Sequence, residues 1–243
     1  MTSDLLLLTA TIRPRAQPGL ALADPVLRLR QYENALQFYC GLLERGVLGA
    51  VIFAENSGYD LAPLQQRFTL PGIEWLSHSD LDYPSTYHRG YAEFRLVEHA
   101  MRHARSLREA DAAARVWKVT GRYVVDNLPS VMRHAPKPFD VYCDVRGAWA
   151  EMSVLAWTPL GYAALLDGLW REFATGMVPE LILASRLDAT CGRAHVVRRF
   201  HWPARVRGQR GSDGSAFDGR WSGLRFALDL VQRRLLLSLN ALH

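Results

Sequence analysis

Cysteine is scarce in this chain, and the few cysteines present form no disulfide or metal-binding pattern. There are three, Cys40, Cys143 and Cys191, and no two of them have Cys-x-x-Cys spacing. This odd number argues against a disulfide-stapled scaffold and predicts a reduced, cytoplasmic compartment. Cys40 and Cys143 stand among apolar residues, so we expect both to be buried in the core.

Long apolar runs and several common motifs are also missing. No stretch approaches the roughly 20 apolar residues that span a bilayer, and the run at 5–12, LLLLTATI, is too short for a signal peptide and precedes no cleavage site. There is no G-x-x-x-x-G-K-[ST], no G-x-G-x-x-G after the first strand and no G-x-S-x-G. The sequence therefore argues against P-loop ATP hydrolysis, NAD-dependent chemistry and serine hydrolysis.

Acidic residues are missing from one region, between Asp188 and Asp213. The net charge of the chain is +5, which predicts an anionic partner such as a nucleotide, a nucleic acid or an acidic membrane surface. No helix-turn-helix, zinc-finger or RNA-binding signature accompanies the region, and a solvated strand pair is the alternative interpretation. The arginines that fall in it are Arg193, Arg198, Arg199, Arg205, Arg207 and Arg210.

Strand-like and helix-like stretches alternate along the chain. Asp24 as an N-cap, Pro25 at the first helical position and Gly46 just past the end are typical of one helix. Such alternation predicts an α/β fold with right-handed crossovers and a mostly parallel central sheet flanked by helices. Strands are expected within 5–12, 49–60, 72–77, 116–119 and 139–147, and helices within 24–46, 60–67 and 88–107.

The helix predicted at 88–107 carries an acid beside its apolar stripe. Phe94, Val97 and Met101 recur at spacings of three and four, and Glu93 falls near that stripe rather than opposite it. Glu93 is therefore expected either to cap the first turn of the helix or to lie at the edge of the sheet, where it would contact a ligand.

Polar side chains follow several of the predicted strands. Because ligands of open parallel sheets bind beyond the carboxyl ends of the strands, we expect these side chains to converge on one site. Cations and hydroxyls predominate, which favours a phosphorylated ligand, with Gly121 allowing close approach of the backbone. Strand-end turns with solvated charges are the alternative. The set comprises Thr9, Thr11, Arg13, Glu55, Asn56, Lys118, Thr120, Arg122, Asp144 and Arg146.

Two pairs of residues have the spacing of metal ligands. His99 and His103 are four residues apart, but they lie opposite the apolar stripe, where a solvated helix face is expected. Asp80 and Asp82 form an Asp-x-Asp pair of the kind that can hold a divalent ion, although such pairs are common in loops.

Five motifs, taken in order, resemble those of small bacterial glycosyltransferases of capsule, O-antigen and lipopolysaccharide synthesis. The resemblance covers most of residues 4–215 and is carried by AENSGYD, HRGYAEFRLVEHAM, KVTGRYVVDN, FDVYCDVRG and RVRGQRGSDGSAF. It implies a GT-A-like fold in one domain, with a Rossmann-like nucleotide-sugar-binding half at 1–147 and an acceptor-side half at 148–243. Where that family carries an Asp-x-Asp, this chain has Lys118 and Arg122.

The resemblance implies transfer of a sugar from a nucleotide-activated donor to a saccharide acceptor of the lipid-linked kind, at the cytoplasmic side of the inner membrane. Two fixed cations can do for a leaving phosphate what a metal ion does, so we expect no metal cofactor, with Mg²⁺ or Mn²⁺ as the alternative. A carboxylate must take the proton of the acceptor hydroxyl. Asp144, Glu151 and Glu93 are the candidates, and the sequence does not separate them.

Two other functions remain as alternatives. A non-enzymatic protein that binds nucleic acid or another anionic polymer would use the arginine-rich segment, although nucleic acid is not the partner that the sequence favours. A sugar nucleotidyltransferase would use the same sheet, but it usually needs a glycine-rich phosphate loop, and TATIRPRAQPG at 9–19 is poor in glycine.

The C-terminal stretch 222–243 predicts a helix. Leu224, Leu228, Val231, Leu235 and Leu242 form one stripe, which we expect to pack on the domain, while Phe226, Leu230 and Leu237 fall outside it. With its flanking arginines, such a helix suits either the surface of an anionic membrane or a core or homodimer contact.

Overall fold

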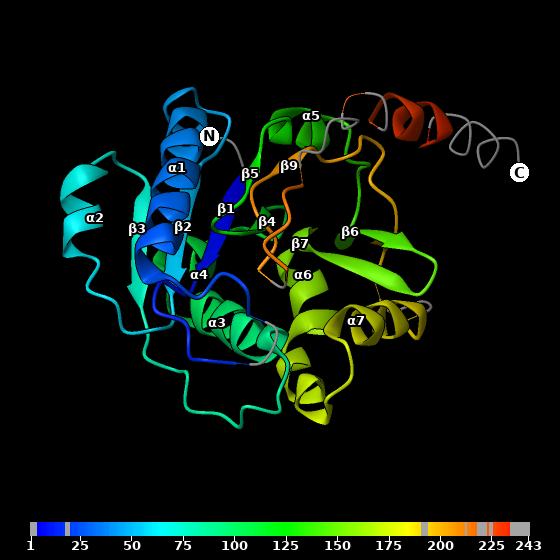
Figure 1. Cartoon of the computed structure of the whole chain (residues 1–243). Helices are drawn as coiled ribbons and strands as arrows, with labels where there is room; N and C mark the ends of the chain where they lie inside the picture. Colours follow the sequence, from blue (N-terminus) through cyan, green and yellow to red (C-terminus); the bar gives the residue numbers. More distant parts are fainter. Residues whose placement is uncertain are drawn as a thin grey trace, which may run out of the picture.

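The computed structural model describes residues 4–17, 20–190, 194–211, 213–217, 223 and 226–233. Cys191, Arg193 and most of the helix predicted at 222–243 lie outside these residues. Within them, a central sheet is flanked by helices, as the sequence predicts (Figure 1).

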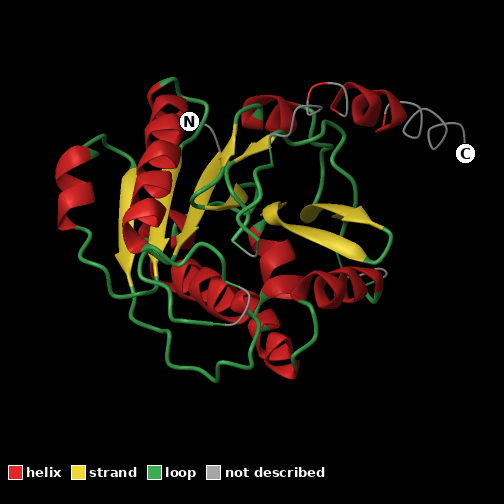
Figure 2. Ribbon diagram, in the orientation of Figure 1, coloured by secondary structure: helices red, strands yellow, loops and turns green. Residues whose placement is uncertain are grey.

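Seven strands of the described residues form this sheet, in the order β3-β2-β1-β4-β7-β6-β8 (Figure 2). Neighbours among the first four strands are parallel, whereas β7 runs antiparallel to both β4 and β6. The prediction of a mostly parallel sheet is confirmed. The strands are β1 (Asp4–Ala10), β2 (Ala50–Glu55), β3 (Ile73–Ser77), β4 (Arg115–Thr120), β6 (Val141–Arg146), β7 (Trp149–Trp157) and β8 (Val196–Val197).

A second, two-stranded sheet pairs β5 (Val124–Val125) with β9 (Val206–Arg207). This pairing places the segment after β9 next to the segment after β4. The two segments are joined by a hydrogen bond in which Arg122 donates to the backbone carbonyl of Gln209. Residues that are far apart in sequence thereby share one edge of the main sheet.

The helices cover both faces of the sheet. In β1, Leu5 and Leu7 belong to one apolar cluster while Leu6 and Leu8 belong to the other, as the period of two residues in a strand requires. The first cluster packs against α3 and α7, and the second against α1 and α5. The helices are α1 (Pro25–Glu44), α2 (Ala62–Arg67), α3 (Arg89–His103), α4 (Arg105–Arg108), α5 (Leu128–Arg133), α6 (Pro159–Gly161) and α7 (Pro179–Asp188).

A local sequence signal explains where α1 begins, whereas a residue distant in sequence accompanies the end of α3. The Oδ1 atom of Asp24 accepts the backbone N–H of Val26 at 2.8 Å, which confirms the predicted N-cap. The helix predicted at 88–107 divides at Ala104, whose backbone is extended. The carboxylate of Glu74, on β3, accepts the backbone N–H of Ser106 at 2.9 Å and so caps α4 separately.

The described part of the predicted C-terminal helix packs by a different face from the one expected. Residues 226–233 are helical, and they lie at the end of the molecule away from α2 (Figure 1). Leu228 and Val231, expected to pack on the domain, are 63% and 57% exposed. Arg233 is buried instead, and Phe226 contacts Trp202. An arginine that reaches a buried carboxylate thus decides the orientation of this helix, which the apolar stripe alone did not reveal.

Candidate functional site

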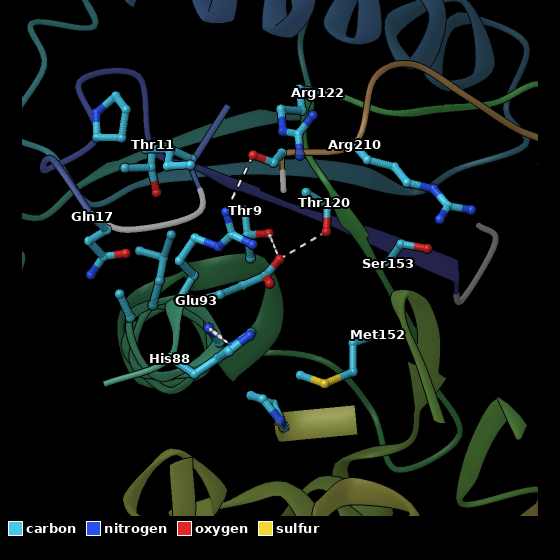
Figure 3. Close-up of a pocket in the computed structure, with 18 of the residues that line it drawn as sticks. Thr9, Thr11, Gln17, His88, Glu93, Thr120, Arg122, Met152, Ser153 and Arg210 are labelled. Carbon is cyan, nitrogen blue, oxygen red and sulfur yellow. Dashed lines mark hydrogen bonds between the residues drawn. The ribbon is translucent and has the colours of Figure 1, made fainter. Parts of the chain in front are cut away.

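A cleft of about 650 Å³ opens at the carboxyl ends of β1 and β4. Because β7 is antiparallel to β4, the beginning of β7 also lies at this edge. The beginnings of α3 and α7, with Arg210, Gly211 and Phe217, also line the cleft. In the view of Figure 3, Thr11 and Gln17 lie on one side of Glu93, and Met152 and Ser153 lie on the other.

The structure brings six of the sequence-predicted site residues together on the surface of this cleft. Four of them carry hydroxyls or a cation from the ends of β1 and β4, and the other two are among the three carboxylates proposed as the base. The six are Thr9, Thr11, Glu93, Thr120, Arg122 and Glu151.

Glu93 forms the centre of the cleft floor. Its Oε1 atom accepts hydrogen bonds from the hydroxyls of Thr9 at 2.8 Å and Thr120 at 2.9 Å, and lies 2.6 Å from Nζ of Lys118 (Figure 3). Burial raises the pKa of Glu93, but the charge and hydrogen bond of Lys118, with the two hydroxyls, outweigh it and hold the pKa below its usual value. Glu93 is the fifth residue of α3, so it lies at the sheet edge rather than capping the first turn.

Lys118 lies beneath the floor and does not line the cleft. Its side chain has no exposed surface, and Nζ also donates to the backbone carbonyl of Met152 at 2.7 Å. A direct contact with a phosphate, as expected from the sequence, would require Lys118 to leave these partners. In the structure Lys118 fixes Glu93 and connects β4 to β7.

Arg28 and Arg122 bring buried positive charge to the cleft. Only 7% and 8% of these residues is exposed. Arg28 donates to the carbonyl of Thr11 at 2.6 Å and to the hydroxyl of Tyr32 at 3.1 Å, while Arg122 donates to the hydroxyl of Tyr123 at 2.6 Å. All of these acceptors are neutral, and neither guanidinium forms an ion pair with a carboxylate of the described residues.

The third buried arginine of the described residues is neutralised, and so is one that is partly buried. Arg233, whose side chain is 3% exposed, donates to both carboxylate oxygens of Asp144, at 2.6 and 2.8 Å. Arg115 pairs with Asp4. A buried charge without a counter-charge is costly. Arg28 and Arg122, which have no ion-pair partner among the described residues, therefore indicate a site for an anion at the cleft.

The beginning of α3 adds to this positive region. His88 is the N-cap, and its Nδ1 atom accepts the backbone N–H of Gly90 at 3.1 Å. Burial and then the charge of Arg89 lower the pKa of His88, which favours the neutral imidazole. Burial, followed by the charges of Arg122 and Arg28, lowers the pKa of Arg89. The guanidinium groups of Arg122 and Arg28 therefore lie close enough to that of Arg89 to repel it, beside the N-terminus of a helix that itself favours anions.

Two exposed arginines extend the positive region along the cleft. Arg15 donates to the carbonyl of Leu81 at 3.4 Å, and the guanidinium of Arg210 lies 4.8 Å from the ring centroid of Phe217. Both line the cleft. Arg210 is the member of the arginine-rich segment that reaches this site.

Glu180 is a cleft carboxylate that the sequence did not single out. It is the second residue of α7, and its Oε2 atom is buried without a hydrogen-bond partner in the described residues. Burial raises the pKa of Glu180, and the nearby charges of Glu151 and Glu93 raise it further. By contrast, Oε1 of Glu151 accepts the backbone N–H of Ser153 at 3.0 Å.

Three other predicted residues support the walls rather than line the cleft. Glu55 accepts the backbone N–H groups of Ile12 at 3.0 Å and Tyr59 at 3.1 Å, so it ties together the loops after β1 and β2. Asn56 accepts the hydroxyl of Thr11 at 2.7 Å. The guanidinium of Arg13 lies 5.0 Å from the ring centroid of Tyr59.

Gly121 permits close approach, but to a neighbouring strand. A Cβ atom on Gly121 would lie 2.8 Å from the carbonyl oxygen of Thr9. That carbonyl accepts the backbone N–H of Gly121 at 2.8 Å. The glycine thus lets the chain turn over the end of β1 after β4.

Asp144 and Arg146 lie away from the cleft. Asp144 accepts both hydrogen bonds of Arg233 and the backbone N–H of Phe200 at 3.2 Å. Although burial raises the pKa of Asp144, these contacts lower it overall. Arg146 is exposed and pairs with Asp229 at 2.9 Å. The structure therefore gives Asp144 a role in fixing the helix at 226–233, not the position that a base in this cleft needs.

Cations stand beside the acids that could hold a divalent metal ion at this edge of the sheet. The end of β4 carries Lys118 and Arg122, and Glu93 is already paired. Asp80 pairs with Arg95 at 2.7 Å. No group of three or more His, Cys, Asp or Glu side chains in the described part of the chain has the arrangement of a metal site.

Three of the five described arginines of the arginine-rich segment form ion pairs within the chain. Arg198 forms an ion pair with Asp188, and Asp126 pairs with Arg205 at 3.4 Å and with Arg207 at 3.1 Å. Because these arginines already pair with acids, they are less available to bind an anionic polymer.

Comparison with known proteins identifies the kind of fold. No protein-family model and no curated protein matches this sequence. A solved structure described as a nucleotide-diphospho-sugar transferase, from Desulfovibrio desulfuricans G20, is similar with a TM-score of 0.50 and 13% identity, over 83% of this chain and 84% of that chain. The fold is thus that of a nucleotide-diphospho-sugar transferase.

Two further similar structures are nucleotidyltransferases by their descriptions. One is 4-diphosphocytidyl-2C-methyl-D-erythritol synthase, with a TM-score of 0.44 and 10% identity over 97% of this chain and 99% of that chain. The other is the inositol-1-phosphate CTP transferase from T. maritima, with a TM-score of 0.45 and 11% identity over 84% of this chain and 88% of that chain.

Among the helices of the described residues, none is long and apolar enough to cross a membrane.

Proposed function

We propose that this chain is a glycosyltransferase that moves a sugar from a nucleotide-activated donor to a saccharide acceptor. The observation that carries the proposal is the pair of buried arginines at the cleft, Arg28 and Arg122, whose hydrogen-bond acceptors within the described residues are neutral oxygens. A diphosphate would supply the missing negative charge, and guanidinium groups suit its oxygens because they donate two parallel hydrogen bonds.

The same cations would serve the chemistry. When the bond between the sugar and the phosphate breaks, negative charge grows on the departing nucleotide. Arg28, Arg89 and Arg122 are held in place before the reaction, so they would stabilise this charge without reorganising. The transfer would then proceed without a divalent metal ion.

The side of the cleft formed by β7 and α7 suits the acceptor. Trp149 lines the cleft and is 45% exposed, which offers an aromatic face to a sugar ring. Glu151 and Glu180 lie on the same side and can accept hydrogen bonds from sugar hydroxyls. Polar groups set among apolar and aromatic side chains are typical of a site for a small molecule.

The acceptor is proposed to be a lipid-linked saccharide of bacterial capsule, O-antigen or lipopolysaccharide synthesis, met at the surface of an anionic membrane. Leu228 and Val231, three residues apart on the helix at 226–233, are exposed, and the guanidinium of Arg205 lies 5.6 Å from the ring centroid of Phe226 on the same helix. Apolar residues beside cations favour the interface of such a membrane.

The reaction products separate this proposal from sugar nucleotidyl transfer on the same fold. The purified chain is incubated either with UDP-glucose, UDP-galactose or GDP-mannose and decyl glycosides, or with nucleoside triphosphates and sugar 1-phosphates. Release of a nucleoside diphosphate together with a lengthened decyl glycoside supports the glycosyltransferase. Release of pyrophosphate from a triphosphate would instead assign a nucleotidyltransferase.

A further inference from the structure

The cleft contains three carboxylates, Glu93, Glu151 and Glu180, and they differ in how their oxygens are used. Oε1 of Glu93 already accepts three donors, including the ammonium of Lys118. A carboxylate that is so well stabilised as an anion is a poor proton acceptor, because its pKa is held low. Glu93 is therefore suited to binding rather than to proton transfer.

Glu151 is held by its own strand. Its Oε1 atom accepts the backbone N–H of Ser153, two residues further along β7. This hydrogen bond turns the carboxylate back along the strand and uses one of its oxygens.

Glu180 is the least satisfied of the three. Its Oε2 atom is buried and has no hydrogen-bond partner among the described residues. A buried carboxylate oxygen without a donor costs free energy, and a ligand hydroxyl that enters the cleft would remove that cost. The charges of Glu151 and Glu93 also increase its affinity for a proton.

The packing of two helix starts holds Glu180 in position. Gly90, in the first turn of α3, faces Pro179, the first residue of α7, so closely that a Cβ atom on Gly90 would lie 2.8 Å from Cγ of Pro179. Glu180 follows directly. Side chains on rigid helices keep their geometry better than side chains on loops, which is what proton transfer requires.

We propose that Glu180 is the general base of the transfer reaction, an inference that rests on the proposed function. An acceptor hydroxyl donates to Glu180 and attacks the anomeric carbon of the donor sugar. The new bond joins the acceptor oxygen to that carbon, the bond from the carbon to the phosphate oxygen breaks, and the electron pair leaves with the nucleoside diphosphate. The proton of the hydroxyl goes to the carboxylate of Glu180, and the single displacement inverts the anomeric configuration.

The test compares Glu180→Gln, which keeps the shape of the side chain but cannot accept the proton, with the wild-type chain in the decyl glycoside assay. A general base contributes about 10²–10⁴-fold, so we expect kcat to fall at least about 100-fold. The change in melting temperature caused by UDP or GDP should remain as in the wild type. Glu109→Gln, which alters an exposed acid at the end of α4, serves as the control with unchanged kcat.

Two further readouts separate a base from a structural residue. Glu180→Asp should recover part of the activity together with the acidic limb of the pH profile of kcat, and this limb should be absent in Glu180→Gln. Full activity of Glu180→Gln in a chain that still transfers sugar, or retention of the anomeric configuration, would overturn the role of Glu180 alone. Pyrophosphate release by the wild-type chain would overturn the proposed function and this role with it.

Discussion

Lys118 Nζ and Glu93 Oε1 lie 2.6 Å apart, and this ion pair supports the floor of the cleft. The Lys118 side chain has no exposed surface, whereas a quarter of the Glu93 side chain is exposed. The pair therefore joins β4 to α3 from below, while the carboxylate faces the space where a ligand would bind. Its first role is to hold Glu93 ionised and in place.

Replacement of Lys118 should destabilise the fold. In Lys118→Met the carboxylate of Glu93 loses its counter-charge, and removal of one partner of a buried ion pair costs about 3–5 kcal/mol. We expect a loss of about 3 kcal/mol in the free energy of unfolding, measured with urea. The double variant Lys118→Met with Glu93→Gln should recover part of this loss. An unchanged urea midpoint in Lys118→Met would contradict the account of the floor.

Acidic pH should destabilise the fold through His99. Burial, then the neighbouring His78 and His103, lowers the pKa of His99 to about 4, and its ring stacks against each neighbour at 4.1 Å between centroids. An unfolded histidine has a pKa of about 6.5, so the unfolded chain binds more protons between pH 6.5 and 4, and stability falls as the pH falls through this range.

Melting temperatures across that pH range check this effect. The slope should be shallower in His99→Gln than in the wild type, and His195→Gln, which alters an exposed histidine, should keep the wild-type slope. Equal slopes in all three proteins would show that protonation of His99 does not cause the loss of stability at acidic pH.

Removal of metal ions should leave turnover unchanged. Arginines rather than carboxylates surround the expected position of the diphosphate, so excess EDTA should not alter the release of nucleoside diphosphate from the donor. A loss of activity with EDTA that Mn²⁺ or Mg²⁺ restores would contradict this prediction. It would make Asp80 and Asp82 candidate ligands again.

Contact with a membrane should depend on the exposed residues of the C-terminal helix. We expect the wild-type chain to float with vesicles that contain phosphatidylglycerol and to be released by salt, because the attraction is partly electrostatic. Leu228→Glu with Val231→Glu should weaken flotation. Leu27→Glu, at a residue that is 45% exposed on α1, is the matched control. Absence of salt-sensitive flotation would leave this proposal without support.

Much of the fold could be predicted because its signals are local. Asp24, Pro25 and Gly46 mark the limits of α1, and the apolar run of β1 predicts a strand that is covered on both faces. The antiparallel insertion of β7 between β4 and β6 was not predicted, because pairing between distant strands leaves no local pattern. The break at Ala104 depends on Glu74, about 30 residues earlier, and was missed for the same reason.

The site was predicted in part. Side chains at strand ends, such as Thr9 and Thr120, could be placed because the carboxyl ends of parallel strands share one edge. Arg28 was missed because a helical arginine usually faces water, and only the three-dimensional fold shows it buried at the cleft. Glu180 has one signal that could have found it, an acid directly after a proline at the start of a helix, but that pattern alone indicates a favourable charge at the helix N-terminus.

The central claim is that the buried cations of the cleft bind the phosphates of a nucleotide, and nucleotide affinity tests it most directly. We expect UDP, GDP or CMP to raise the melting temperature of the wild-type chain, because a ligand that binds only the folded state stabilises it. Arg28→Met and Arg122→Met should each raise the Kd for the nucleotide more than about tenfold, since a hydrogen bond to a charged group contributes about 1.5–3 kcal/mol. Arg205→Met, at an exposed arginine that pairs with Asp126, should bind as the wild type does. If none of the three nucleotides raises the melting temperature, or if both cleft variants keep the wild-type Kd, the account is contradicted.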